Sequence, residues 1–180
     1  MPKAFDLNRN HFDLFGIEPR FAVDLPALDS AYRDLQSQVH PDKYAHLSSA
    51  EQRAALQWAT HVNGAYQTLK SPLFRARYLI ELAGIETGEA ANRALPAAFL
   101  MEQMEWREAV EAARAGGDAA TLAVLDRDSA TAIRQRHLEL EQALDVEHDA
   151  GSAQRALVHL MFLDKLREEI GDALDSIATA

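Results

Sequence analysis

Apolar residues recur every three or four positions along most of this chain, which is the spacing of one face of an α-helix. Residues His11 to Gly16 predict a short helix that the glycine stops, and Asp24 is suited to cap a second helix to about residue 39. The segment Ser48-Ser49-Ala50-Glu51 has the form of a capping box and predicts a third helix to about residue 69. Ser71-Pro72 opens a fourth helix, which Gly84 closes.

Three longer helices are predicted in the second half. The first runs from Pro96 to about Ala115, and the second from about residue 119 to about residue 147. After a turn at 149–152, the last helix has an apolar seam made of Leu160, Leu163, Leu166, Ile170, Leu174 and Ile177. Short turns between such helices favour an antiparallel three-helix bundle. No stretch alternates long enough to predict a strand, so the predicted fold class is all-α.

Helical periodicity is lost between residues 85 and 95, which predicts a linker. The expected organisation is an N-terminal domain of residues 1–84, the linker 85–95 and a C-terminal domain of residues 96–180.

The chain contains no cysteine, which excludes disulfides, thiolate nucleophiles, cysteine-based zinc sites and cysteine-ligated iron-sulfur clusters. The N-terminus has no apolar signal core, and no run of some ~18 apolar residues occurs. A soluble cytoplasmic protein is therefore expected. Any cluster or redox chemistry would belong to a partner, and no cofactor is expected in the chain itself.

The net charge of −10 is unevenly distributed. Residues 1–80 carry nine Lys/Arg against eight Asp/Glu, a net charge of +1, whereas residues 81–180 carry nine against twenty, a net charge of −11. Phosphate backbones and anionic membranes would repel such an acidic half, so nucleic acid and membrane are poor partner candidates. The acidic half is either a partner-binding surface or a solvated surface that serves solubility.

His40-Pro41-Asp42, followed by Lys43, interrupts the polar and apolar periodicity between the second and third helices. Proline fixes its own φ angle and disfavours the α region for the preceding residue, so the helix must end here. An imidazole, a rigid ring and a carboxylate then form a short recognition edge on a loop.

Candidate catalytic groups are few. His40 and Asp42 are too close in sequence to orient as a nucleophile and base pair, and no Gly-x-Ser-x-Gly element is present. His137 and Glu141 lie one helical turn apart and could share a metal, but no His-Glu-x-x-His element surrounds them. Gly116-Gly117 lacks the lysine and hydroxyl residue of a nucleotide loop. A protein without enzymatic activity is expected.

The helix from Pro96 mixes apolar and acidic residues on one surface, since Leu100, Met104 and Glu108 share a stripe beside Met101 and Glu105. Neighbouring methionines suit an adaptable binding surface. The alternative is that Leu100 and Met104 face the core, as apolar residues at helical spacing usually do.

The His-Pro-Asp loop between two helices resembles that of J-domain co-chaperones. The resemblance continues through 63–69 and 72–79, and the blocks Phe99–Glu105 and Phe162–Leu166 narrow it to the HscB-type co-chaperones of iron-sulfur cluster assembly. It covers essentially the whole chain. That family has a J-domain followed by an acidic three-helix bundle, and the chain is most similar to its bacterial members.

The resemblance implies two partners. The J-domain would stimulate the ATPase of an HscA-type seventy-kilodalton heat-shock chaperone, using His40, Pro41 and Asp42 for docking rather than proton transfer, with Arg33 and Lys43 as basic contacts. The C-terminal bundle would bind an IscU-type iron-sulfur scaffold protein through a patch at Leu100, Met101, Met104, Glu105, Glu108 and Phe162.

One position departs from the family pattern. A further acidic residue of the patch, one turn beyond Glu108, is Ala112 here, and Glu111 can replace it only in part. Two alternatives to the expected function stay open: a J-domain co-chaperone that serves a different client protein, and an enzyme that uses His40 or the pair His137 and Glu141.

Overall fold

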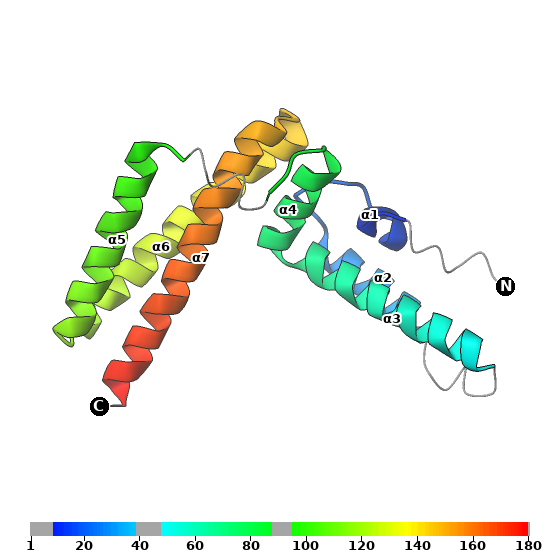
Figure 1. The fold of residues 1–180 in the computed structure, drawn as a ribbon, viewed down its shortest axis with the longest axis horizontal. Helices are drawn as coiled ribbons and strands as arrows, with labels where there is room; N and C mark the ends of the chain where they lie inside the picture. Colours follow the sequence, from blue (N-terminus) through cyan, green and yellow to red (C-terminus); the bar gives the residue numbers. More distant parts are fainter. Residues whose placement is uncertain (1–8, 39–47, 88–94, 180) are drawn as a thin grey trace. The chain divides into compact units, whose positions relative to one another are not determined.

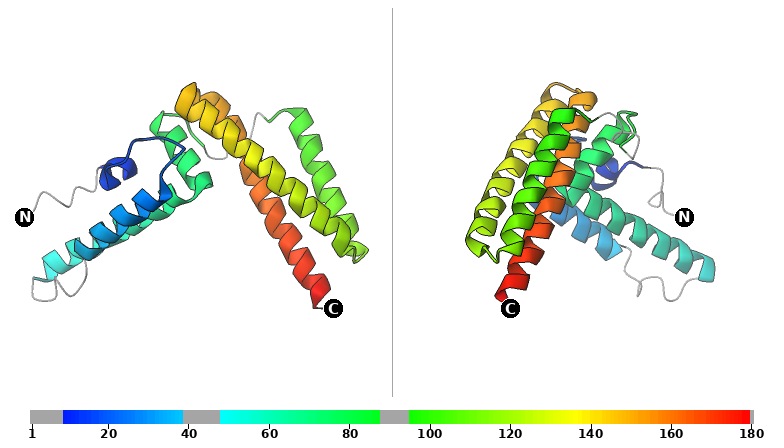
Figure 2. Two further views of the ribbon diagram at one scale, coloured as in Figure 1. Left: turned by 180° about the vertical axis from the view of Figure 1, so that it is seen from behind. Right: turned by 60° about the vertical axis from the view of Figure 1, so that its left-hand side comes forward.

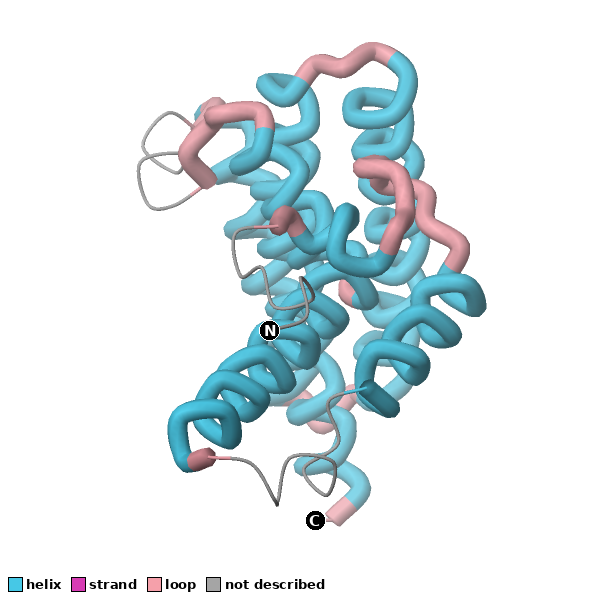
Figure 3. The backbone as a smooth tube through the Cα atoms, turned by 90° about the vertical axis from the view of Figure 1, so that its right-hand side faces the viewer, coloured by secondary structure: helices cyan, strands magenta, loops and turns pink. Residues whose placement is uncertain are grey.

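The computed structural model describes residues 9–38, 48–87 and 95–179 of the 180-residue chain. His40, Pro41, Asp42 and Lys43 lie outside the described residues, as does most of the predicted linker at 85–95. All regular structure in the described part is helical (Figure 3), which confirms the predicted all-α fold class.

Contacts divide the chain into two units, residues 1–79 and 80–180. The helices that begin in the first unit are α1 (His11–Phe15), α2 (Leu25–Gln38), α3 (Ser49–Lys70) and α4 (Pro72–Leu82) (Figure 1). The second unit contains α5 (Ala97–Ala115), α6 (Ala119–Glu141), the π-helical turn η3 (Gln142–Val146) and α7 (Ala150–Ala178). The predicted limits of the domains, at residues 84 and 96, stay a prediction.

Helix ends follow the local sequence signals. Asn10 caps α1 by accepting from the Asp13 amide, and Gly16 ends the helix in the left-handed region at φ 65°. Ser48 and Glu51 form the predicted capping box of α3. Each such cap satisfies backbone groups that the first or last turn of a helix leaves without an intrahelical partner.

The core of the first unit lies between α1, α2 and α3. Phe12 and Leu28 are fully buried there, together with Trp58, Val62 and Leu69 from α3. Because α2 and α3 are antiparallel neighbours (Figure 1), they form a helical hairpin whose described ends at Gln38 and Ser48 flank the segment that contains His40-Pro41-Asp42.

In the second unit, α6 and α7 run antiparallel and α5 packs alongside them (Figure 2). The predicted seam of α7 is buried at Leu160, Leu163, Leu166 and Ile170, and half-buried at its last two positions. The helix predicted from about residue 119 to about residue 147 is not α-helical to its end. The α-helix α6 stops at Glu141, and the chain continues as the wider π-helical turn η3. Side-chain periodicity alone does not distinguish an α-helix from a single π turn.

Candidate functional site

Helix α5 has two faces that both carry large apolar residues. Phe99, Val110 and Ala113 are buried against α6 and α7, and Trp106 is half-buried between them. These positions follow helical spacing, so they account for the side of α5 that belongs to the core. The remaining apolar residues of this helix must therefore point elsewhere.

Leu100, Met101 and Met104 are on the outer side of α5, where 46%, 62% and 60% of their surfaces are exposed. Glu105 and Glu108 are exposed beside them. We call these five residues the α5 patch. The alternative that Leu100 and Met104 face the core is wrong, because Phe99 and Trp106 supply that stripe instead. Leucine and methionine exposed next to carboxylates form a surface suited to a partner with apolar and basic groups.

Phe162 does not share this exposure. Only 9% of its surface is accessible, because it belongs to the core between α5 and α7. Its ring meets Phe99 edge to face at 6.1 Å between centroids, and the guanidinium of Arg107 lies 5.8 Å from its centre. Phe162 therefore adds little accessible surface to the predicted patch. Its contribution to partner binding stays a prediction, and one that can act through the position of α5.

Ala112 and Glu111 are both exposed on α5 beyond Glu108. The position where the family pattern has a further acidic residue is thus accessible but carries a methyl group. The α5 patch is consequently less acidic at this end than the pattern implies.

On the hairpin, Arg33 is exposed on α2, and its role as a basic contact stays a prediction. His40, Pro41, Asp42 and Lys43 lie outside the described residues, so their roles stay predictions.

Sequence reasoning missed a line of contacts between α2 and α3. Three residues of α2 at spacing i, i+3 and i+7 contact three residues of α3 at the same spacing, and the six are Asp29, Tyr32, Gln36, Asn63, Tyr66 and Lys70. We call this set the polar seam. Its signal was present in the sequence, because i, i+3 and i+7 positions share a helix face.

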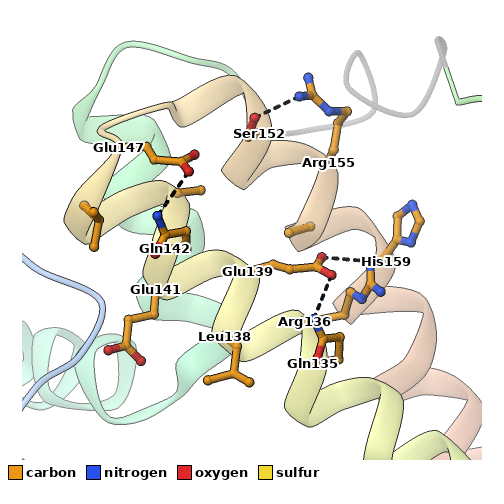
Figure 4. A pocket seen from close by; sticks show the side chains of 13 residues that line it. Gln135, Arg136, Leu138, Glu139, Glu141, Gln142, Glu147, Ser152, Arg155 and His159 are labelled. Carbon is orange, nitrogen blue, oxygen red and sulfur yellow. Dashed lines mark hydrogen bonds and ion pairs between the residues drawn. The ribbon is translucent and has the colours of Figure 1, made fainter.

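The second unit also contains an open groove of about 780 Å³ between the end of α6, η3 and the start of α7 (Figure 4). Several of its polar side chains have partners. Arg136 is paired with Glu139 at 2.8 Å, and Arg155 donates to the hydroxyl of Ser152 at 2.8 Å. That hydroxyl in turn donates to Asp149, the residue that caps α7. These contacts are those of helix termini and surface ion pairs rather than of an activated nucleophile.

His159 lines the same groove and stacks on Phe99 with ring centroids 3.8 Å apart. Burial lowers the pKa of His159, and the nearby charge of Arg136 adds to the effect. The neutral imidazole therefore serves as part of the packing between α5 and α7.

The predicted pair His137 and Glu141 lies on α6, where His137 is half-buried and Glu141 is exposed. No group of three or more His, Cys, Asp or Glu side chains is placed to hold a metal ion within the described residues. None of the described helices is both long enough and apolar enough to span a membrane.

Comparison with known proteins gives a consistent result. Residues 95–171 match the family model described as the HSCB C-terminal oligomerisation domain. The chain is 48% identical over 176 residues to the co-chaperone protein HscB homolog of Aromatoleum aromaticum, covering 98% of this chain and 99% of the relative.

Two solved structures have the same fold. Chaperone HscB from Vibrio cholerae is 36% identical with a TM-score of 0.83, and the match covers 94% of this chain and 99% of that one. Human co-chaperone protein HscB is 29% identical with a TM-score of 0.86, over 92% of this chain and 82% of that one. The predicted J-domain followed by a C-terminal helical bundle is thereby confirmed, and the chain belongs to the HscB family of co-chaperones.

Proposed function

We propose that this protein is a two-ended adaptor for iron-sulfur protein maturation. Its C-terminal unit binds an IscU-type scaffold protein, and its J-domain stimulates the ATPase of an HscA-type chaperone. The observation that carries the proposal is the α5 patch, in which leucine and two methionines are exposed although a separate stripe of the same helix supplies the core.

The patch is suited to protein recognition. Exposed apolar side chains grouped on one helix mark an interaction surface more often than scattered ones do. Methionine adapts its shape to a partner, and Glu105 and Glu108 add charges that select basic groups at the rim of the contact. We assign the scaffold protein to this surface because the HscB family resemblance maps its scaffold contacts onto these residues.

At the other end, Asp42 offers a carboxylate to an arginine of the chaperone, and Pro41 holds that edge rigid. A charge-assisted hydrogen bond of this kind is about twice as strong as a neutral one. Arg33, exposed on α2, and Lys43 supply basic contacts to the chaperone. The protein has no catalytic step of its own in this scheme, since ATP is bound and hydrolysed by the chaperone.

Joining both binding sites in one chain raises the local concentration of the scaffold at the chaperone. The mechanism therefore needs two independent surfaces rather than one active site. Nucleic acid and membranes have no role in it, and the bacterial cytoplasm is the expected compartment.

The deciding experiment is steady-state ATP turnover by an HscA-type chaperone with this protein and an IscU-type scaffold present. The intact protein should accelerate turnover, whereas His40→Gln and Asp42→Asn should not, although both variants should still bind the scaffold. Acceleration that is equal with the loop variants would rule out the role of the loop.

A J-domain co-chaperone with a different client is the alternative. Titration of the intact protein with the purified scaffold separates the two, because the alternative predicts no saturable binding and no dependence on Leu100 or Met104.

A further inference from the structure

The polar seam between α2 and α3 lies outside both proposed contact surfaces. Three of its residues, Gln36, Asn63 and Lys70, are exposed, whereas Tyr66 is buried in the core of the first unit. The seam joins side chains that are far apart in sequence, from 27 residues for Gln36 and Asn63 to 37 residues for Asp29 and Tyr66. One end of the seam, at Gln36, lies in the last turn of α2, directly before the segment that contains His40-Pro41-Asp42.

The end of the seam nearer to residue 38 is a three-way hydrogen-bond cluster. The Tyr32 hydroxyl donates to Asn63 Oδ1 at 2.9 Å, and Gln36 Nε2 donates to the same oxygen at 3.2 Å and to the Tyr32 hydroxyl at 2.5 Å. Gln36 belongs to the last turn of α2. Asn63 Oδ1 is thus the single acceptor through which α3 contacts this last turn in the seam.

The other end of the seam is a charged cluster. The Tyr66 hydroxyl donates to Asp29 at 2.7 Å and accepts from Lys70 at 2.6 Å, and Lys70 lies 3.7 Å from the Asp29 carboxylate. The hydrogen bond to Tyr66 raises the pKa of Lys70, with a smaller contribution from Asp29. Between the two ends, the rings of Tyr32 and Tyr66 stack at 3.9 Å.

These contacts can exist in only one axial alignment of the helices. A shift of α2 along α3 by one turn would break the contacts that cross between the helices, which join Tyr32 and Gln36 to Asn63, and Asp29 to Tyr66 and Lys70. Apolar contacts are non-directional and can repack after such a shift. Because the hydrogen bonds at Asn63 and the ion pair of Lys70 with Asp29 are accessible to water, they contribute little net stability. Hydrogen bonds are directional, and a single asparagine buried between the helices of a coiled coil is known to fix their alignment.

We propose that the polar seam is a positioning device, in which Asn63, Tyr32 and Gln36 fix the alignment of α2 on α3 and thereby the direction in which the chain leaves α2 toward His40. This inference rests on the proposed stimulation of a chaperone ATPase. A recognition edge only three residues long needs a rigid support, because docking geometry is lost with small displacements.

A matched pair of variants at Asn63 tests the proposal. Asn63→Leu removes the shared acceptor, whereas Asn63→Asp keeps an acceptor oxygen for both Tyr32 and Gln36. Maximal stimulation of the chaperone ATPase should fall at least about tenfold in Asn63→Leu and stay near the original value in Asn63→Asp. Tyr32→Phe removes the hydroxyl but keeps the ring and the hydrogen bond from Gln36 to Asn63, so its loss should be smaller than that of Asn63→Leu. Gln57→Leu, also on exposed α3 surface, controls for an added leucine.

Stability separates positioning from simple unfolding. The melting temperature of Asn63→Leu should fall by less than about 4 °C, so the variant stays folded at the assay temperature. Loss of stimulation that merely follows the unfolded fraction would overturn the proposal, and so would full stimulation by folded Asn63→Leu.

A second readout does not depend on the chaperone. Since the chain has no cysteine, nitroxide labels can be placed through Ser37→Cys and Gln67→Cys, at exposed positions of α2 and α3. The label-to-label distance distribution should broaden or shift in Asn63→Leu and Tyr32→Phe, but not in Asn63→Asp. An unchanged distribution would overturn the proposal even if ATPase stimulation fell.

Failure of the proposed function would look different. In that case the unsubstituted protein would not stimulate the chaperone ATPase, and neither would any of the variants.

Discussion

On the outer face of α5, three large apolar side chains stand in water next to two carboxylates. In the polar seam, side chains of α2 and α3 are hydrogen-bonded to one another. Burial of apolar surface supplies most of the free energy of association, so the α5 patch is suited to hold a partner. Directional hydrogen bonds supply geometry at little net stability, so the hairpin is suited to present a short edge in one orientation. If the proposed function holds, we expect the C-terminal unit to provide affinity for the scaffold and the N-terminal hairpin to provide alignment toward the chaperone.

Within the C-terminal unit, Phe162 is buried, whereas Leu100, Met101 and Met104 on α5 are exposed. Phe162→Ala should destabilise this unit by about 3–5 kcal/mol, because a buried phenyl ring is replaced by a cavity. Chemical denaturation followed by Trp106 fluorescence, in a Trp58→Phe background, measures the change. Met101→Ala is the control and should stay within about 0.5 kcal/mol. Equal stability of the two variants would contradict the assignment of Phe162 to the core.

A variant that removes the apolar part of the α5 patch tests the affinity end. Leu100→Ala with Met104→Ala should weaken scaffold binding by about 2 kcal/mol, or roughly 30-fold, because both side chains would be covered in the complex. Isothermal titration gives the dissociation constant, and circular dichroism confirms the helix content. Unchanged affinity in the folded double variant would show that the scaffold binds elsewhere.

The charge missing at Ala112 gives a finer test of the same surface. Ala112→Glu should tighten scaffold binding about threefold at low salt, since exposed ion pairs contribute about 0.2–1 kcal/mol. The gain should vanish at high ionic strength, where the charges are screened. Ala112→Gln is the neutral control. A gain of equal size with glutamine would point to packing rather than charge.

The smallest expected effect is a pH dependence of the N-terminal unit. His11 stacks on Tyr78 and lies 5.7 Å from His61, and burial, followed by the nearby His61, lowers the pKa of His11 from its ordinary value of 6.5. The unfolded chain therefore takes up a proton at higher pH than the folded chain does. Stability should be unaffected by this group above about pH 7.5 and should fall as the pH drops through 6.5.

His11→Phe keeps a ring on Tyr78 but removes the titrating group. Urea denaturation followed by Trp58 fluorescence, in a Trp106→Phe background, should show a weaker pH dependence between pH 7.5 and pH 5 than the unsubstituted histidine. A steeper dependence in His11→Phe would contradict the direction assigned to this pKa.

Local signals in the sequence predicted most of the helices. The capping box at Ser48 and Glu51, Pro72 at the start of α4 and Gly16 after α1 are all confirmed. These helix ends could be predicted from the sequence because a helix end is specified by residues within one turn of it. The turn η3 was missed, since the spacing of side chains around Ala143 fits either helix type.

The two sides of α5 show where sequence reasoning stops. Helical spacing places Phe99 and Leu100 on neighbouring but different stripes, and both stripes are apolar. Composition could not decide which stripe faces the core, because burial depends on the positions of α6 and α7. Periodicity likewise could not decide whether Phe162 is buried. The family resemblance placed Phe162 in the binding patch, whereas the structure buries it in the core between α5 and α7.

By itself, the sequence determined the all-α class, the helix ends, the acidic second half and the His-Pro-Asp motif, because these depend on residue type and on neighbours within one turn. Only the tertiary structure decided that Leu100, Met101 and Met104 are exposed, that Phe162 is buried, and that Asp29, Tyr32 and Gln36 meet Asn63, Tyr66 and Lys70. The physical reason is that exposure and side-chain pairing are set by contacts between helices. The contacts named here join residues at least 27 positions apart, beyond the range over which local periodicity acts.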